Sequence, residues 1–128
     1  GWVSGFIYRS YAFDYIRELE MLQEAGCHPL EVVKAATYNG AELLGLSDTG
    51  TIEKGKKADL VIVSENPLQN FKVLYGTGHF RFDHESGKTE RVQAIDYTIK
   101  DGIVFDVKIL LKQVKALVQE QKNIEISN

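Results

Sequence analysis

The sequence is poor in cysteine and has no long apolar segment. Cys27 is its single cysteine, which excludes an intrachain disulfide and gives no sign of an oxidising compartment. No apolar run approaches the ~20 residues that a helix needs to cross a bilayer. The first residues also lack a basic segment followed by an apolar core and a cleavage site. We therefore expect a soluble, cytoplasmic protein without a membrane partner.

Neither sign of charge dominates the sequence. Its 15 basic and 18 acidic residues are interspersed, and the formal net charge is -3. No cluster of lysine and arginine is long enough to form a face that binds phosphates. We expect no nucleic-acid partner.

The spacing of apolar residues predicts helices in the first third of the chain. From residue 11 to 25 apolar side chains recur every three or four positions, which is typical of an amphipathic helix. Pro29 suits the first turn of a second helix. A short third helix is expected over 40–44, with Thr37 or Asn39 as its cap.

The middle of the chain is richer in strand signals. Leu60–Val63 is a short uncharged run of β-branched character, which predicts a strand buried on both faces, and Asn66-Pro67 ends it. Residues 71–75 are expected to form a short strand. Residues 83–89 are expected to form an exposed polar loop.

Two further strands and a helix are predicted at the end of the chain. The runs 92–99 and 103–105 are joined by Lys100-Asp101-Gly102, a strong signal for a β-hairpin because Asp-Gly tolerates positive φ. Asp106 is placed to cap a final helix that frays after Lys122. The apolar face of this helix consists of Val107, Leu110, Leu111, Val114, Leu117 and Val118.

These elements predict one α+β domain over residues 1–128. Residues 1–46 form its helical segment, 50–105 a small and mainly antiparallel β-sheet, and 106–122 its C-terminal helix. The length is sufficient to bury roughly two-thirds of the surface of the unfolded chain.

Several short segments occur in a distinctive order. Ala35-Ala36-Thr37 precedes Ala41-Glu42-Leu43-Leu44-Gly45-Leu46, residues 50–61 are Gly-Thr-Ile-Glu-Lys-Gly-Lys-Lys-Ala-Asp-Leu-Val, and Asn66-Pro67-Leu68 follows. In this order they resemble the carboxyl-terminal end of the metal-dependent amidohydrolase superfamily, in particular its imidazolonepropionase-like and prolidase-like members. The clear match covers residues 16–74, and a looser one continues to residue 105.

The resemblance implies a role within a larger enzyme. Residues 1–46 would be the remnant of the end of a TIM barrel, and residues 50–105 part of the β-sandwich that flanks it. A complete barrel takes about 250 residues, more than the 128 of this chain. The implied activity is hydrolysis of C–N bonds in amides, cyclic amides or dipeptides by a protein of which this chain is the C-terminal portion, inactive alone.

The resemblance also implies where the metal centre of such an enzyme would lie. Its ligands come from a His-x-His pair, a lysine or glutamate bridge, two further histidines and an aspartate in a Gly-Thr-Asp-Ser type motif. That motif is expected just before the first helix, where this chain has Trp2-Val3 in place of Thr-Asp. Unless Asp14 substitutes, we expect no catalytic, cofactor-binding or metal-binding residue here. Zinc or a similar divalent metal is expected only in the full-length family enzyme.

Histidines and the cysteine are the remaining candidates for chemistry. His79 and His84 are five residues apart, which places them on opposite faces of a strand. Asp83-His84-Glu85 has groups that a stray cation would bind, but a solvated loop is the expected state. Cys27 beside His28 suggests a nucleophile and a base, yet no third orienting group is evident. We expect Cys27 to be a partly buried residue at a helix junction.

Three lysines and an aspartate surround the turn before the predicted strand at residue 60. Lys54, Lys56 and Lys57 flank Gly55 without the order of a phosphate-binding loop, so we expect them to keep the turn soluble. Asp59 is expected to accept hydrogen bonds from the preceding turn rather than to act in catalysis.

Two functions are consistent with these observations. In the first, the chain gives structural support to a C–N hydrolase whose catalytic residues lie elsewhere. In the second, it is a free-standing truncated domain that serves as a binding or oligomerisation module. In that case the apolar faces of helices within residues 11–46 need a partner, and a homodimer would cover them.

Overall fold

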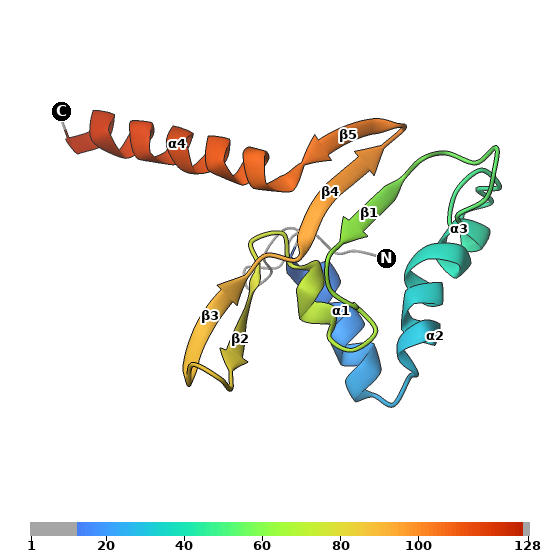
Figure 1. The fold of residues 1–128 in the computed structure, drawn as a ribbon. Helices are drawn as coiled ribbons and strands as arrows, with labels where there is room; N and C mark the ends of the chain where they lie inside the picture. The colour runs from blue at the N-terminus through green and yellow to red at the C-terminus, as the bar shows by residue number, and fades with distance from the viewer. Residues whose placement is uncertain (1–12, 127–128) are drawn as a thin grey trace.

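A computed structural model describes residues 13–126 and shows an α+β fold, as the sequence predicts (Figure 1). Within residues 13–126, four α-helices, a π-helical turn, a 3₁₀ turn and five strands follow one another. Their bounds are α1 Phe13–Glu24, α2 Pro29–Lys34, η1 Ala35–Asn39, α3 Gly40–Leu43, β1 Leu60–Val63, η2 Phe71–Leu74, β2 His79–Asp83, β3 Lys88–Val92, β4 Ile95–Lys100, β5 Ile103–Asp106 and α4 Val107–Ile126.

The chain stays helical from α2 through the π-helical turn into α3. Asn39 has helical backbone angles and makes no side-chain cap. The hydroxyl of Thr37 donates back to the Val33 carbonyl at 2.8 Å instead of capping α3. The predicted cap at Thr37 or Asn39 is therefore wrong, because a helix that does not begin anew leaves no free amide groups for a cap to bind. His28 is the residue that does cap, at the start of α2.

The core lies between the first two helices and the 3₁₀ turn. Ile16 and Leu19 from α1 pack with Val32 from α2 and Phe71 from η2. Phe71 and Val32 are each 1% exposed. A turn far along the chain thus fixes the angle between two helices near its start.

Two predictions about the strand segments need correction. Leu60–Val63 is a strand, but Val61 and Ile62 are 55% and 45% exposed, so it is not buried on both faces. Successive side chains of a strand point to opposite faces of the sheet, so both faces are partly open at β1, the edge strand of the sheet β1-β4-β5. The segment predicted as a strand over 71–75 forms the 3₁₀ turn η2 instead. The side chain of Asn70 caps this turn by accepting a hydrogen bond from the Lys72 amide.

Strands β4 and β5 form the predicted hairpin. Asp101 and Gly102 have φ values of 49° and 80°, the positive values that a two-residue Asp-Gly turn requires. Asp59, just before β1, holds this turn: its carboxylate accepts the Asp101 amide at 2.8 Å and the Lys100 ammonium at 2.6 Å. The sequence predicted the preceding turn as the partner of Asp59. In the structure its partner is the later hairpin instead.

We predict that replacing Asp59 with asparagine makes the free energy of unfolding less dependent on pH in the acidic range. The Asp101 amide and then the Lys100 ammonium hold the pKa of Asp59 below its ordinary value of 3.8. A lowered folded-state pKa contributes stability above the unfolded pKa, and this contribution is lost as pH falls through the folded value. Asp59→Asn should therefore lower the urea midpoint at neutral pH, and the difference from the parent should close below 3.8. A difference that does not change with pH would contradict this account.

A second hairpin was not predicted. Strands β2 and β3 pair antiparallel from His79↔Val92 to Asp83↔Lys88, so both ends of the expected loop over 83–89 belong to strands, and only residues 84–87 form the turn. Asp83 shapes the turn, since its carboxylate accepts the amides of Glu85 and Ser86. Hydrogen bonds from the Ser86 side chain and the Glu85 amide lower the pKa of Asp83.

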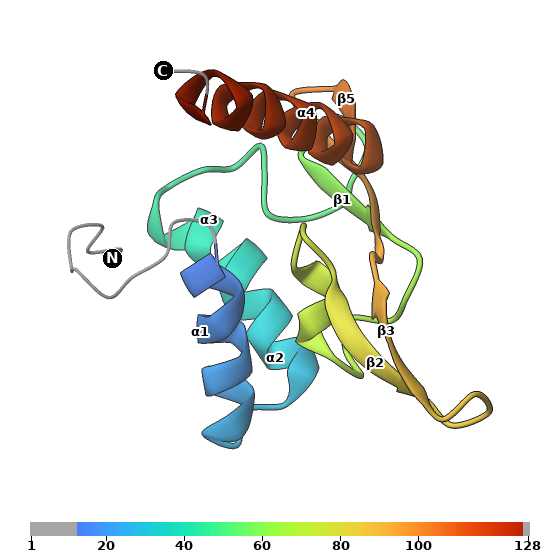
Figure 2. The same cartoon turned by 90° about the vertical axis from the view of Figure 1, so that its left-hand side faces the viewer.

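The last helix leaves the sheet directly from β5. Asp106 accepts the Ile109 amide at 3.0 Å, which confirms it as the cap. The helix continues past Lys122 to Ile126, so fraying after Lys122 is not observed. In two views at right angles α4 lies apart from α1 and α2, and its principal contacts are with β4 and β5 (Figures 1 and 2).

Candidate functional site

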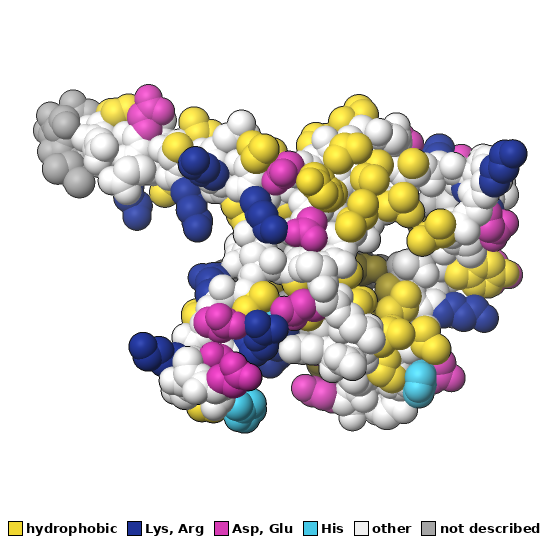
Figure 3. Space-filling model, in the orientation of Figure 1, with side chains coloured by type: hydrophobic (Ala, Val, Ile, Leu, Met, Phe, Trp, Pro, Cys, Tyr) yellow, Lys and Arg dark blue, Asp and Glu magenta, His cyan; other side chains and the backbone are white. Residues whose placement is uncertain are grey.

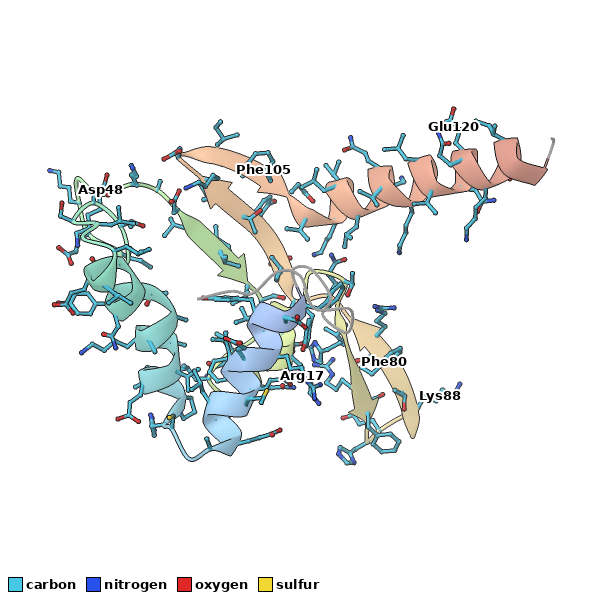
Figure 4. All side chains as sticks on the ribbon, turned by 180° about the vertical axis from the view of Figure 1, so that it is seen from behind. Arg17, Asp48, Phe80, Lys88, Phe105 and Glu120 are labelled. Atoms are coloured by element: carbon cyan, nitrogen blue, oxygen red, sulfur yellow. The ribbon has the colours of Figure 1, made fainter. Side chains whose placement is uncertain are left out.

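A polar pocket lies where the 3₁₀ turn meets β2. It has a volume of about 440 Å³. In Figure 4 the labelled Phe80 marks β2 beside this pocket, and Glu120 marks the distant part of α4. The pocket is lined by Glu65, Asn66, Gln69, Asn70, Val73, His79, Phe80 and Arg81.

Local turns set the orientation of the two asparagines. Asn66 accepts the Leu68 amide at 3.0 Å, and Asn70 accepts the Lys72 amide at 3.0 Å. Each side-chain oxygen is therefore committed to the backbone, which leaves the amide nitrogen to face other groups. Asn66, which follows β1, and Asn70, which caps η2, both line one wall of the pocket.

A charged network forms the other wall. Glu65 accepts a hydrogen bond from Arg81 at 3.0 Å, and Arg81 also reaches Glu90 at 2.7 Å. The hydrogen bond to Glu90 and the charge of Glu65 raise the pKa of Arg81. The guanidinium is thus shared between two carboxylates, so it is not a free anion-binding group.

Among the residues that the structure describes, His79 is the one buried polar side chain, and the sequence did not predict its burial. It is 6% exposed, and its Nε2 lies 3.6 Å from Glu65. Its Nδ1 is buried without a hydrogen-bond partner. No serine, threonine or cysteine is among the pocket residues, so this histidine has no nucleophile to activate there.

The other residues singled out in the sequence are dispersed. His28 caps α2 through Nδ1, which accepts the Leu30 amide at 3.3 Å. His84 packs edge-on against Phe82 in the turn of the second hairpin. Cys27 is exposed, contrary to the expected partial burial, because it lies in the open connection between α1 and α2. Nothing brings these side chains together.

Two lysines of the turn before β1, Lys56 and Lys57, form surface ion pairs. Lys57 lies 3.0 Å from Asp48, and Lys56 pairs with Glu53 and with the Thr51 hydroxyl. These contacts fold the turn on itself. Lys56 and Lys57 therefore bind groups in and beside the turn itself.

The described residues do not fit the metal centre that the resemblance implies for a complete enzyme. Within residues 13–126 no group of three or more histidine, cysteine, aspartate or glutamate side chains is arranged to hold a metal ion. Asp14 lies in the first turn of α1 and belongs to no such group. Trp2 and Val3 lie outside the described residues. The same part of the chain contains no helix with the length and apolar character needed to cross a membrane.

Large apolar side chains cover much of the surface instead. Leu43 and Leu44 at α3 are 88% and 73% exposed, and Ile52 in the following turn is 87% exposed. Figure 3 shows hydrophobic side chains gathered over the three-stranded sheet and further ones along α4. Contiguous apolar surface of this kind is typical of an interaction face.

Comparison with known proteins places most of the chain in one family. The model of the amidohydrolase family matches residues 10–108. This range contains every described element from α1 to β5 and ends at the start of α4.

Individual relatives match over shorter segments. The imidazolonepropionase of Thermoplasma acidophilum is 51% identical over 47 residues, which are 36% of this chain and 12% of the relative. That of Flavobacterium johnsoniae is 60% identical over 52 residues, 39% of this chain and 12% of the relative. The 5-methylthioadenosine/S-adenosylhomocysteine deaminase of Caldicellulosiruptor saccharolyticus is 32% identical over 97 residues, 74% of this chain. The chain spans only 12% to 21% of the length of these relatives.

Proposed function

The chain belongs to the amidohydrolase family, and we propose that it gives structural support, as a C-terminal portion, to a hydrolase acting on C–N bonds. In this role the helices α1 to α3 would cover the end of a TIM barrel, and the sheet β1-β4-β5 would complete a flanking β-sandwich. The catalytic metal, zinc or a similar divalent ion, would be held by residues outside the described part of the chain.

One observation carries this proposal. The segment that matches the family exposes the largest apolar side chains of α3 and the turn after it, while residues 13–126 contain no group that could hold a metal. A catalytic unit would show the opposite, with buried apolar faces and clustered ligands. A supporting layer needs a larger body to cover Leu43, Leu44 and Ile52.

The relatives support a proposal for the substrate class. Two of those named above are imidazolonepropionases, enzymes whose name denotes an imidazolone substrate. We propose an amide, a cyclic amide or a dipeptide as the substrate of the complete enzyme. We also propose a cytoplasmic location, because a single cysteine is usual for proteins of reducing compartments.

We predict that the purified chain neither retains zinc nor turns over substrate. It should be incubated with zinc, dialysed and analysed for metal, then assayed on imidazolone compounds and on acyl-proline dipeptides. The expected metal content is far below one ion per chain, with no activity above buffer. Stoichiometric zinc together with turnover would reject the supporting role. His79→Gln serves as a control, since loss of any residual zinc in this variant would identify binding at the pocket.

A second candidate function is a free-standing binding or oligomerisation module. The exposed side chains of α3 favour it, because a chain that works alone must cover them with a partner. The homodimer expected from the sequence would bury the faces of α1 to α3. Replacing Leu43 with glutamate would then shift the mass measured by light scattering from dimer to monomer, whereas the supporting role predicts no change.

A further inference from the structure

The apolar stripe of α4 repeats with the period of a coiled coil. In a coiled coil, apolar residues recur about every 3.5 residues at two positions of a seven-residue repeat, called a and d. Starting from Val107, three repeats give six a and d positions, of which five are apolar and one is Gln121. We call them the seam: Val107, Leu110, Val114, Leu117, Gln121 and Ile124.

The seam is accessible over most of its length. Val107 is buried against the sheet at 8% exposure, but Leu110 is 40% exposed. Further along, Val114, Leu117 and Ile124 are 53%, 60% and 50% exposed. The helix therefore uses its first turn to attach to β4 and β5 and presents the rest of the seam to a partner. Its opposite side is occupied by lysines, among them Lys108, which binds Asp96 at 2.7 Å.

The family match does not account for this stripe. It ends at residue 108, so nearly all of α4 lies beyond the part that the chain shares with the family. A heptad stripe fits another helix, because each a or d side chain inserts between four residues of a facing helix. A second copy of α4 offers such a helix with the same repeat.

We infer that α4 pairs with α4 of a second copy of this chain in an antiparallel two-helix interface. The positions beside the seam decide the direction. On one side, the apolar flank, are Leu111 and Val118; on the other, the polar flank, are Gln113 and Glu120. Parallel helices would set each apolar flank against a polar flank. Antiparallel helices set Leu111 against Val118 and Gln113 against Glu120, which buries apolar groups with apolar groups. Antiparallel helix dipoles also attract one another.

This arrangement fixes which residues meet. Each a residue faces a d residue of the partner, so Val114 lies opposite Leu117, and Gln121 opposite Leu110. An interface of one helix from each copy is small, so we expect dimers at micromolar concentration rather than an obligate complex. The inference is independent of whether the chain supports catalysis, because every seam residue after Val107 lies outside the family match.

The test measures mass and crosslinking of the whole chain. Light scattering should show a mass approaching twice 14.4 kDa as concentration rises. Leu117→Glu should shift the protein to monomer, while Lys115→Glu on the opposite side of α4 and Leu43→Glu on α3 should not. Circular dichroism shows whether each variant keeps its helix. A protein that is monomeric at all concentrations, or a dimer lost with Leu43→Glu but kept with Leu117→Glu, would overturn the inference.

Cysteine pairs test the direction without relying on a destabilising change. In a background with Cys27→Ser, Leu110→Cys combined with Gln121→Cys should form disulfides between copies. Each single variant should form none, because antiparallel helices separate two copies of residue 121 by about 16 Å along the axis, beyond the ~7 Å limit for a disulfide. Rapid crosslinking of Gln121→Cys alone would overturn the antiparallel arrangement.

Discussion

Replacing Phe71 with alanine should cost about 3–5 kcal/mol of folding free energy. Phe71 is 1% exposed and packs with Ile16, Leu19 and Val32, so the substitution removes an aromatic ring from the contact between both helices and the 3₁₀ turn. The total stability of a domain of this size is about 5–15 kcal/mol. The loss should therefore lower the urea midpoint strongly in an unfolding curve followed by far-UV circular dichroism. Protein concentration must be held constant, because association adds to apparent stability.

Phe82→Ala is the matched control for this prediction. Phe82 is 53% exposed on β2 and touches His84 at the hairpin turn rather than the core. Surface substitutions of this kind usually change stability by about 0.5 kcal/mol or less. If both variants lose the same stability, Phe71 does not organise the core, and the two helices must be held by other contacts.

Local signals predicted elements well where one physical effect dominates. The Asp-Gly turn between β4 and β5 needs positive φ at two positions, and few residue pairs provide it, so the hairpin was predicted correctly. The cap at Asp106 was also predicted correctly, since its carboxylate accepts the Ile109 amide. The caps at Thr37 and Asn39 failed because the same residues also tolerate a continuous helix, and tertiary packing decided between the two.

The candidate site could not be predicted in the same way. His79 and Glu65 are brought together by the end of β1 and the start of β2, and no spacing in the sequence indicates that contact. The burial of His79 also depends on the second hairpin, whose strands carry many charged residues and give a weak apolar alternation. By contrast, a resemblance built on residues 35–68 identified the family, because its glycines and its Asn-Pro have fixed structural roles.

Replacing Gly78 with alanine should destabilise the protein by about 2 kcal/mol or more, through strain and overpacking together. Gly78 has φ +83°, which residues with a Cβ adopt only at a cost. An added Cβ would lie 2.5 Å from the Val92 carbonyl oxygen. That oxygen belongs to the backbone at the end of β3 and is held by the His79↔Val92 pair, so it cannot move aside without opening the hairpin.

Gly87→Ala separates the two causes of this loss. Gly87 also has a positive φ, +65°, but nothing lies within 4 Å of the position of its Cβ. Its substitution should therefore cost only the backbone strain of about 1 kcal/mol. Unfolding curves of the two variants, measured at one protein concentration, give the excess that the Val92 contact contributes. Equal losses would mean that β3 does not approach Gly78 so closely, and that the hairpin beside the His79 pocket is not fixed by this contact.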